Sequence, residues 1–375
     1  MKKIISMVLV CILACMLFAG CSAPATQSSA APSESAATQG SAAPEASQSA
    51  GADESAAPAA DITIGYSFPT KNNEFWGNAL AYVNQAADEL GFKVNAVDAN
   101  NEQEKQVNDV NNLLSSGING LVLGPQDASV VPGILDACKA KNVPVIIIDR
   151  WPGDELKAGE DYVAFIGPND EQAGYDIAMS LIDGGAKKIV GIGGYQGTSV
   201  AEGRKAGLDK ALKEHPEVEL LQFVYAGENM DDGDEAIRNL LQAHPDLDGV
   251  WCYNDSLALA SVNVLKEQGT IDKVKVGGMD LLQPAIDSMK ANELWFSTGG
   301  HYMQAADAAV ILYDYINGHK LTTDPVIKIN LLAVSQENMD KYEAKYGEGK
   351  TPIVWKDLSM TYTPDAQQNF DLSLD

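Results

Sequence analysis

Blocks of apolar residues and blocks of mixed polarity alternate along most of the chain. From Ile62 onward, short apolar runs of strand length are separated by amphipathic segments of helical length. The strand-like runs are ITIGYSF, FKVNAVD, INGLVLG, VPVIIID, DYVAFIG, KKIVGIG, VELLQFVYA, DGVWCYN, VKVGGMD and LWFSTGG. Continuous apolar runs are typical of strands covered by helices on both faces. The pattern predicts an α/β fold with parallel sheets.

The segments between these runs have the caps and periodicity of helices. EKQVNDVNNLLSSG ends at Gly117, a residue type that commonly terminates helices, and EAIRNLLQAHP has a helical apolar face. The strand and helix units fall into two groups that divide near residues 166–169, which predicts two similarly built lobes. Ligands of open parallel sheets bind beyond the carboxyl ends of the strands, so we expect a cleft there.

Polar and aromatic side chains follow the predicted strands. They are Asn73, Phe75 and Trp76 after the first strand, Asp149 and Arg150 after the fourth, and residues 198–204, Glu228, Asn254, Asp255 and Asp280 after later ones. A sugar presents hydroxyl groups at its edge, which carboxylates, amides and guanidinium groups can bond, and C–H groups on its faces, which aromatic rings can cover. This set of side chains predicts a site for a neutral polyhydroxyl ligand.

Two interpretations are open for the rings in NNEFW. Phe75 and Trp76 could begin the helix FWGNALAYVNQAADELG and pack only in the core. Alternatively, they could stack on a sugar while Asn73 bonds to its edge. We expect at least one of the two rings to contact the ligand.

Similar alternatives apply to the polar pairs at the later strand ends. Asp149 and Arg150 could form a surface ion pair of little energetic value, but they directly follow a buried apolar strand, and we expect them to bind ligand. Asn254 or Asp255 could serve only as a helix N-cap. We assign Asn254 to the ligand and Asp255 to the cap or to a contact between the lobes.

The N-terminus has the features of an export signal followed by a linker. Residues 1–20 combine Lys2 and Lys3 with an apolar stretch and small residues, as in a secretory signal peptide. The segment LFAGC resembles a bacterial lipobox, which implies lipidation of Cys21. An ordinary signal peptide with a chance cysteine is the alternative. Residues 21–61 are rich in Ala, Ser and Pro and contain few apolar side chains large enough to form a core, so we expect a disordered tether.

Charge and cysteine content narrow the possible functions. The net charge of −26 argues against binding to nucleic acid, which requires clustered Lys and Arg.

Of the five cysteines, Cys138 and Cys252 lie in separate apolar segments of the folded region. We expect both to be buried as small hydrophobic residues. A disulfide between them is an alternative in an exported protein.

Several of these segments together resemble the type I periplasmic binding proteins, in particular the ribose-binding group of sugar-importing ABC transporters. The matching marks are NNEFW, VPVIIIDR, GTSVAEGRKAGL, LLQAHPDLDGVWCYND and VGGMD, spread over residues 62 to about 331. The resemblance implies two Rossmann-like parallel-sheet lobes joined by a three-crossing hinge, with crossings near residues 166–169, 299–302 and 324–327. It implies an N-terminal lobe of residues 62–166 plus 301–325, and a C-terminal lobe of residues 167–300 plus 326–375. We expect the extension from Ala333 onward to pack on the second lobe.

The resemblance also implies which residues contact the ligand. By alignment, the family's sugar contacts fall on Asn73, Phe75, Trp76, Asp149, Arg150, Asn254 and Asp280. The chain departs from the ribose binders by having Glu202 in place of an Arg, Glu228 in place of an aromatic residue, Gly300 in place of Gln and Gly124 in place of Asn. We add Glu202, Glu228 and His301 as candidate contacts. The added carboxylates favour another sugar, a polyol or an amino sugar over ribose, and Arg150 argues against a simple cation.

The resemblance predicts a monomeric, lipid-anchored binding protein on the outer face of the cell membrane that delivers a sugar or polyol to an ABC transporter permease. A sensor that signals to a membrane receptor is the alternative. An enzyme is disfavoured because the four histidines are scattered and neither HExxH nor GxSxG occurs. A transcriptional repressor would carry a DNA-binding helix pair where this chain has its tether. We expect no metal and no cofactor, because the acidic segment NMDDGDEA lacks EF-hand spacing.

Overall fold

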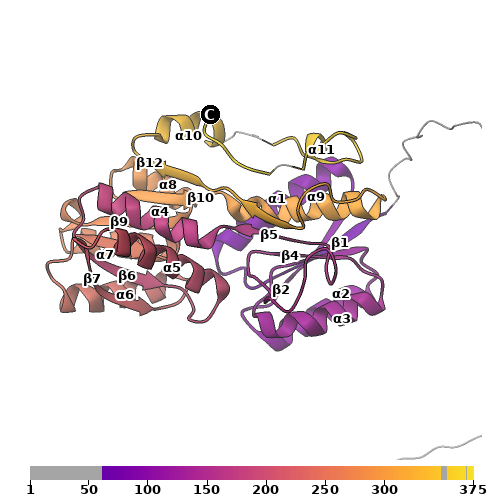
Figure 1. The fold of residues 1–375 in the computed structure, drawn as a ribbon, viewed down its shortest axis with the longest axis horizontal. Coiled ribbons are helices and arrows are strands. Elements are labelled where there is room, and N and C mark those ends of the chain that lie inside the picture. Colours follow the sequence, from indigo (N-terminus) through magenta and orange to yellow (C-terminus); the bar gives the residue numbers. More distant parts are fainter. Residues whose placement is uncertain (1–60, 348–352, 369) are drawn as a thin grey trace, which may run out of the picture. The chain divides into compact units, whose positions relative to one another are not determined.

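The computed structural model describes residues 61–347, 353–368 and 370–375. Two six-stranded sheets with interleaved helices make up this region (Figure 1). All ten runs predicted as strands are strands, β1 to β10, and the predicted α/β fold with two parallel-sheet lobes is confirmed. The predicted signal peptide, Cys21 and the tether up to residue 60 lie outside the described residues.

The first sheet forms the N-terminal lobe, and all its strand pairs are parallel. Its strands in spatial order are β11 (Val326–Ile329), β5 (Ala164–Pro168), β4 (Val145–Ile148), β3 (Gly120–Leu123), β1 (Thr63–Phe68) and β2 (Lys93–Asp98). Helices α1 (Glu74–Leu90), α2 (Gln103–Ser115), α3 (Val131–Ala140) and α9 (Gln304–Ile316) pack around it. Because the strands are parallel, the ends of β1 and β4 lie at the same edge, which brings distant segments of the sequence together.

The second sheet forms the C-terminal lobe. Its strands in spatial order are β12 (Leu332–Ser335), β10 (Phe296–Gly299), β9 (Lys275–Asp280), β8 (Gly249–Cys252), β6 (Lys188–Gly193) and β7 (Glu219–Tyr225). Its pairs are parallel except β10 with β12, which is antiparallel. Within the described ranges, the second lobe has one apolar core, and the first lobe has two, which contain alternate residues of its strands. Cys138 and Cys252 are buried free thiols in different cores, as expected, and burial raises the pKa of each to about 12.

Helices and short 3-10 turns connect the strands. The helices are α1 (Glu74–Leu90), α2 (Gln103–Ser115), α3 (Val131–Ala140), α4 (Asp170–Asp183), α5 (Ser199–Glu214), α6 (Met230–Ala243), α7 (Asp255–Glu267), α8 (Gln283–Lys290), α9 (Gln304–Ile316), α10 (Met339–Tyr346) and α11 (Trp355–Leu358), with 3-10 turns at Ala128–Val130, Ile271–Lys273 and His301–Met303. Among the described residues, no helix combines the length and the apolar character needed to cross a membrane.

The chain passes between the two sheets at three places. Two lie where the sequence predicts them, after β5 and after β10. The third follows β11 rather than preceding it, because Val326–Ile329 pairs in parallel with β5 in the first sheet. The assignment of residues 326–329 to the C-terminal lobe is therefore wrong, and the third crossing lies between Ile329 and Leu332. An edge strand of only four residues, with Lys328 at its third position, gives little apolar signal in the sequence.

The C-terminal extension contacts both lobes, which corrects the expectation that it packs on the second lobe alone. β12 and α10 add Met339 and Tyr342 to the core of the second lobe. The chain then returns to the first lobe, where Trp355 is buried in the core and its ring lies edge-on to Tyr82. Its last residues contact the second lobe again, with Leu372 packed on that core. Figure 1 draws α10, α11 and the last residues of the chain in yellow.

Candidate ligand-binding site

The carboxyl ends of the strands of both lobes surround one small cavity of about 20 Å³. Its walls are Asn73, Phe75, Trp76, Asp149, Arg150, Arg204, Glu228, Tyr253, Asn254, Asp280 and His301. Nine of the ten residues that the sequence proposes as ligand contacts are in this set, and Glu202 is absent from it. A cavity of this size holds about one water molecule, so a sugar requires the two lobes to move apart.

Asn73, Phe75 and Trp76 reach the cavity from the start of α1. The side-chain oxygen of Asn73 accepts a hydrogen bond from the backbone N–H of Phe75, so Asn73 caps the helix and keeps its amide N–H₂ for other partners. Both rings are buried in the first core and also line the cavity, so the two interpretations of NNEFW are compatible. Gly124 leaves room for Trp76, because a Cβ there would lie 3.0 Å from the indole ring.

Asp149 and Asp280 stand at the ends of β4 and β9 on strained backbone. Asp149 has φ of 66° and Asp280 has φ of 126°, a region that side-chain-bearing residues rarely adopt. A Cβ at Gly299 would lie 2.3 Å from the backbone carbon of Asp280, so only glycine fits beside it. Such strain costs about 1–3 kcal/mol per residue and is common where the backbone must aim a functional group.

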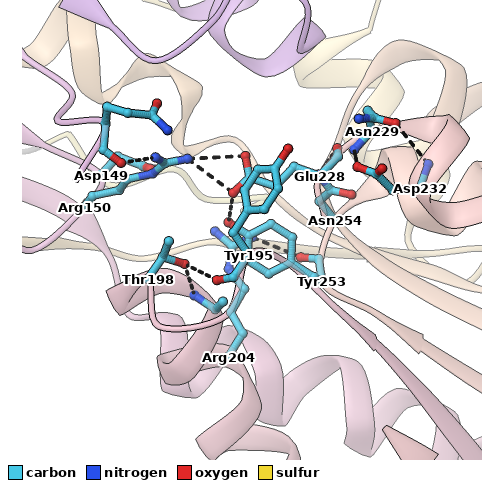
Figure 2. A network of polar contacts seen from close by, with 12 residues as sticks. Asp149, Arg150, Tyr195, Thr198, Arg204, Glu228, Asn229, Asp232, Tyr253 and Asn254 are labelled. Atoms are coloured by element: carbon cyan, nitrogen blue, oxygen red, sulfur yellow. Dashed lines mark hydrogen bonds and ion pairs between the residues drawn. The ribbon is translucent and has the colours of Figure 1, made fainter. Parts of the chain in front are cut away.

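Arg150 and Glu228 form an ion pair that joins the two lobes (Figure 2). The guanidinium donates to both Glu228 carboxylate oxygens at 3.2 and 3.3 Å, and to the backbone oxygen of Gln126 at 2.8 Å. Tyr253 Oη donates to the same carboxylate at 3.2 Å. Burial alone would lower the pKa of Arg150, but the charges of Glu228, Tyr253 and Asp149 outweigh it and the pKa is raised.

Arg204 and Tyr253 line the cavity although neither is among the ten candidate contacts, and the sequence places Arg204 only in the stretch 198–204 after a predicted strand. Arg204 donates to Asp170 at 3.0 Å and to the backbone oxygen of Tyr253 at 3.0 Å, and its guanidinium lies 4.3 Å from the centre of the Tyr253 ring. A close approach of α4 to α5 brings Asp170 to Arg204, since a Cβ at Gly174 would lie 1.8 Å from the Arg204 backbone oxygen. Helical periodicity could have found Arg204, which shares the buried face of α5 with Val200 and Leu208.

Glu202 lies outside the cavity, which corrects its assignment as a candidate contact. Its exposed side chain accepts hydrogen bonds from the backbone N–H of Gly197 and from Tyr225 Oη, both at 2.9 Å. Residues two positions apart point to different sides of a helix, so Arg204 and Glu202 cannot both face the cleft.

Asn254 and Asp255 have roles that differ from the predicted division. Asn254 lines the cavity and is also the N-cap of α7, accepting from the backbone N–H of Leu257, while its amide donates to the backbone oxygen of Glu228. Asp255 is the first residue of the helix and bonds within its own lobe, to Ser297 Oγ and the backbone N–H of Leu282. Asp255 therefore supports the loop after β9, beside Asp280.

His301 lies at the second crossing between the lobes. Its ring stacks obliquely on Phe75, with 4.7 Å between ring centres, and its Nε2 atom is 3.8 Å from Asp280. Burial and the nearby Arg204 hold the pKa of His301 well below its usual value. The buried Nδ1 atom has no hydrogen-bond partner among the described residues, so it is available to a ligand. In that part of the chain, no group of three His, Cys, Asp or Glu side chains could hold a metal ion.

Comparisons with known proteins agree with this geometry. Residues 64–320 match the model of the periplasmic binding protein domain. The ribose import binding protein RbsB of Bacillus subtilis is 30% identical over 237 residues, which cover 62% of this chain and 74% of that protein. The xylitol-binding protein of Mycolicibacterium smegmatis is 24% identical and covers 64% of this chain and 68% of that protein.

Solved structures are similar over most of the described region. An ABC transporter solute-binding protein from Mycobacterium smegmatis with bound glycerol has a TM-score of 0.69 and 26% identity, covering 78% of this chain and all of that one. A periplasmic sugar-binding protein from Pseudomonas fluorescens has a TM-score of 0.74 and 22% identity, covering 84% of this chain and 99% of that one. These relatives are binding proteins, in agreement with the expectation that this chain is not an enzyme. The chain therefore belongs to the periplasmic binding protein family, with the two-lobed fold that its sequence predicts.

Proposed function

We propose that this protein captures a sugar or polyol between its two lobes outside the cytoplasm and delivers it to an ABC importer. The observation that carries the proposal is the cavity wall, where amide, guanidinium and carboxyl groups from both lobes surround aromatic rings. Each sugar hydroxyl both donates and accepts hydrogen bonds. The guanidinium and amide N–H groups of the wall are donors, and its carboxyl and amide oxygens are acceptors. Rings from α1 would cover the apolar face of the sugar.

Binding and closure are coupled because the two lobes supply different contacts. Asn73, Asp149 and Arg150 come from the first lobe, and Arg204 and Asp280 from the second. A ligand that bonds to both sets favours the closed arrangement over the open one. The Arg150–Glu228 pair must open to admit a sugar, and its members then bond to ligand hydroxyls. No covalent step is required.

The relatives support this ligand class. The matched proteins are named for the import or binding of ribose, xylitol and apiose, and one solved relative contains D-allose and another myo-inositol. All of these molecules are polyhydroxylated. A permease as partner follows from the descriptions of several relatives as ABC transporter components.

A thermal-shift screen tests the proposal. A ligand that binds only the folded protein adds about 2.7 kcal/mol of stability at a hundredfold excess over its Kd. Since 1 kcal/mol corresponds to about 2–4 °C in a chain of this size, we expect the melting temperature to rise by about 5 °C or more with one of the pentoses, hexoses, polyols or amino sugars. The proposal fails if amino acids or nucleosides give the only shift.

We also propose that Cys21 carries a lipid that holds the protein at the outer face of the membrane. The support is the order of charged start, apolar stretch and small residues before Cys21 in the sequence. Several acyl chains on one cysteine anchor a protein more firmly than a single chain does. In a bacterial host, Cys21→Ser should move the protein from the membrane fraction to the soluble fraction, while Ser22→Ala should not. Retention of the Cys21→Ser protein in the membrane would contradict the anchor.

A further inference from the structure

The cavity contains more carboxyl groups than its two arginines neutralise. Arg150 is paired with Glu228, and Arg204 is paired with Asp170, each within hydrogen-bonding distance. Both arginines are buried, so neither charge is shared with solvent. Asp149 and Asp280 line the same cavity and remain without a guanidinium or ammonium partner among the described residues.

Among the described residues, no guanidinium or ammonium group lies within ion-pairing distance of these two remaining carboxyl groups. Asp149 accepts one hydrogen bond, from the neutral amide of Gln304 at 2.9 Å. Asp280 lies 3.8 Å from His301, whose lowered pKa leaves the ring neutral. Burial, together with the charges of Asp255, Asp149 and Glu228, raises the pKa of Asp280 well above its usual value, although Arg204 opposes the shift. Crowding of like charges in a buried site is relieved when a cation enters.

The structure also removes the argument against a positively charged ligand. In the sequence, Arg150 follows Asp149 directly and would repel a cation. In the structure its charge is matched by Glu228, which Tyr253 and the Asn254–backbone contact hold in place. Asp170, the first residue of α4, matches the charge of Arg204 in the same way. In the closed arrangement, carboxylates of the protein itself thus match the charges of both arginines.

We propose that the natural ligand carries a protonated amine in addition to its hydroxyl groups, as an amino sugar or an aminopolyol does. The ammonium group faces the carboxyl groups of Asp149 and Asp280, and the hydroxyl groups bond to Asn73 and the arginines. An ammonium group offers three N–H donors to these acceptors, and charge-assisted bonds are about twice as strong as neutral ones. The inference rests on the proposed function and specifies the substrate class of the same site.

Matched pairs of ligands test the inference by calorimetry at neutral pH. Glucosamine is compared with glucose, galactosamine with galactose, and 1-amino-1-deoxy polyols with their parent polyols, and N-acetylglucosamine controls for size without charge. We expect at least one amine to bind about tenfold or more tightly than its parent and its acetylated form. Glu228→Gln should reduce this preference about tenfold, because it leaves the charge of Arg150 unmatched. Glu202→Gln, the same change outside the cavity, should leave the preference unaltered.

The outcomes separate the inference from the proposed function. If neutral sugars bind as tightly as their amino counterparts, or N-acetylglucosamine as tightly as glucosamine, the amine is not recognised and the inference is overturned while sugar binding stands. If no sugar, polyol or amine binds, the proposed function fails as well. If the Glu228→Gln protein prefers amines as strongly as the unchanged protein does, the charge of the cavity does not cause the preference, and the inference is also overturned.

Discussion

Replacing Arg150 with alanine is expected to weaken ligand binding at least thirtyfold. Truncating one member of a buried, hydrogen-bonded charge pair typically costs about 2–5 kcal/mol in binding, or about thirtyfold to several thousandfold in affinity. Arg150 is 5% exposed and Glu228 is 7% exposed, so water cannot replace the lost guanidinium in the closed protein. In the proposed function, Arg150 also donates hydrogen bonds to the ligand hydroxyls, and the substitution removes this donor. Isothermal titration with the sugar found in the thermal-shift screen measures the loss.

The same substitution should leave the melting temperature of the free protein nearly unchanged. Removing Arg150 leaves the Glu228 carboxylate with Tyr253 as its side-chain donor, but separation of the lobes exposes it to water. The energetic cost of this unpaired buried carboxylate is therefore relieved when the lobes separate, and the lobes themselves stay folded. Arg238→Ala is the matched control, because this arginine is half exposed on α6 and pairs only within its own lobe. If the Arg150→Ala protein lost fold stability in proportion to its affinity, the residue would be structural.

The strands that carry the site could be predicted because they are buried on both faces. Runs such as VIII in β4 and GVWC in β8 are apolar throughout, and their polar residues begin where the strands end. Because parallel strands all end at the same edge of their sheet, these polar residues are predicted to lie together once the strands are known. For this reason Asp149, Arg150, Asn254 and Asp280 could be grouped from the sequence alone.

Pairings between distant charged residues could not be predicted in this way. Glu228 follows β7, and nothing in its neighbourhood in sequence indicates that it meets Arg150, 78 positions earlier. Within residues 198–204, alignment with the ribose binders favours Glu202 over Arg204, although Arg204 lies on the otherwise apolar, buried face of the helix. Choosing the buried face of α5 first would have selected the correct residue.

Which lobe each segment of the C-terminal extension covers could not be predicted from the sequence, for a different reason. Its segments are short and mostly polar, so hydrophobic periodicity gives no strong signal for which lobe they cover. Their position depends instead on specific hydrogen bonds to buried groups. The clearest case is Asp314 on α9, a carboxylate that is 1% exposed and binds donors from four residues of the extension.

Asp314→Ala should therefore release the extension from the first lobe and lower the free energy of unfolding by about 3 kcal/mol or more. The carboxylate accepts hydrogen bonds from Ser359 Oγ at 2.6 Å, from the backbone N–H groups of Met360 and Thr361 at 2.8 and 3.1 Å, from Thr361 Oγ1 at 2.9 Å and from Gln368 at 3.1 Å. A hydrogen bond to a charged group contributes about 1.5–3 kcal/mol, and buried donors left unpaired cost about 1–3 kcal/mol each. Denaturant titration measures the loss of stability.

Hydrogen exchange distinguishes release of the extension from general destabilisation. If Asp314 holds the extension, the backbone N–H groups of residues 355–363 should exchange faster in the Asp314→Ala protein, whereas those of β6 and β8 in the second lobe should not. In the Asp314→Asn protein, exchange at residues 355–363 should be faster than in the unchanged protein and slower than in the Asp314→Ala protein, because the amide keeps one accepting oxygen. Asp340 lies on the exposed side of α10, so Asp340→Ala should change neither the free energy of unfolding nor the exchange at residues 355–363. Unaltered exchange at residues 355–363 in the Asp314→Ala protein would contradict the prediction and show that the apolar contacts of Trp355 hold the extension without Asp314.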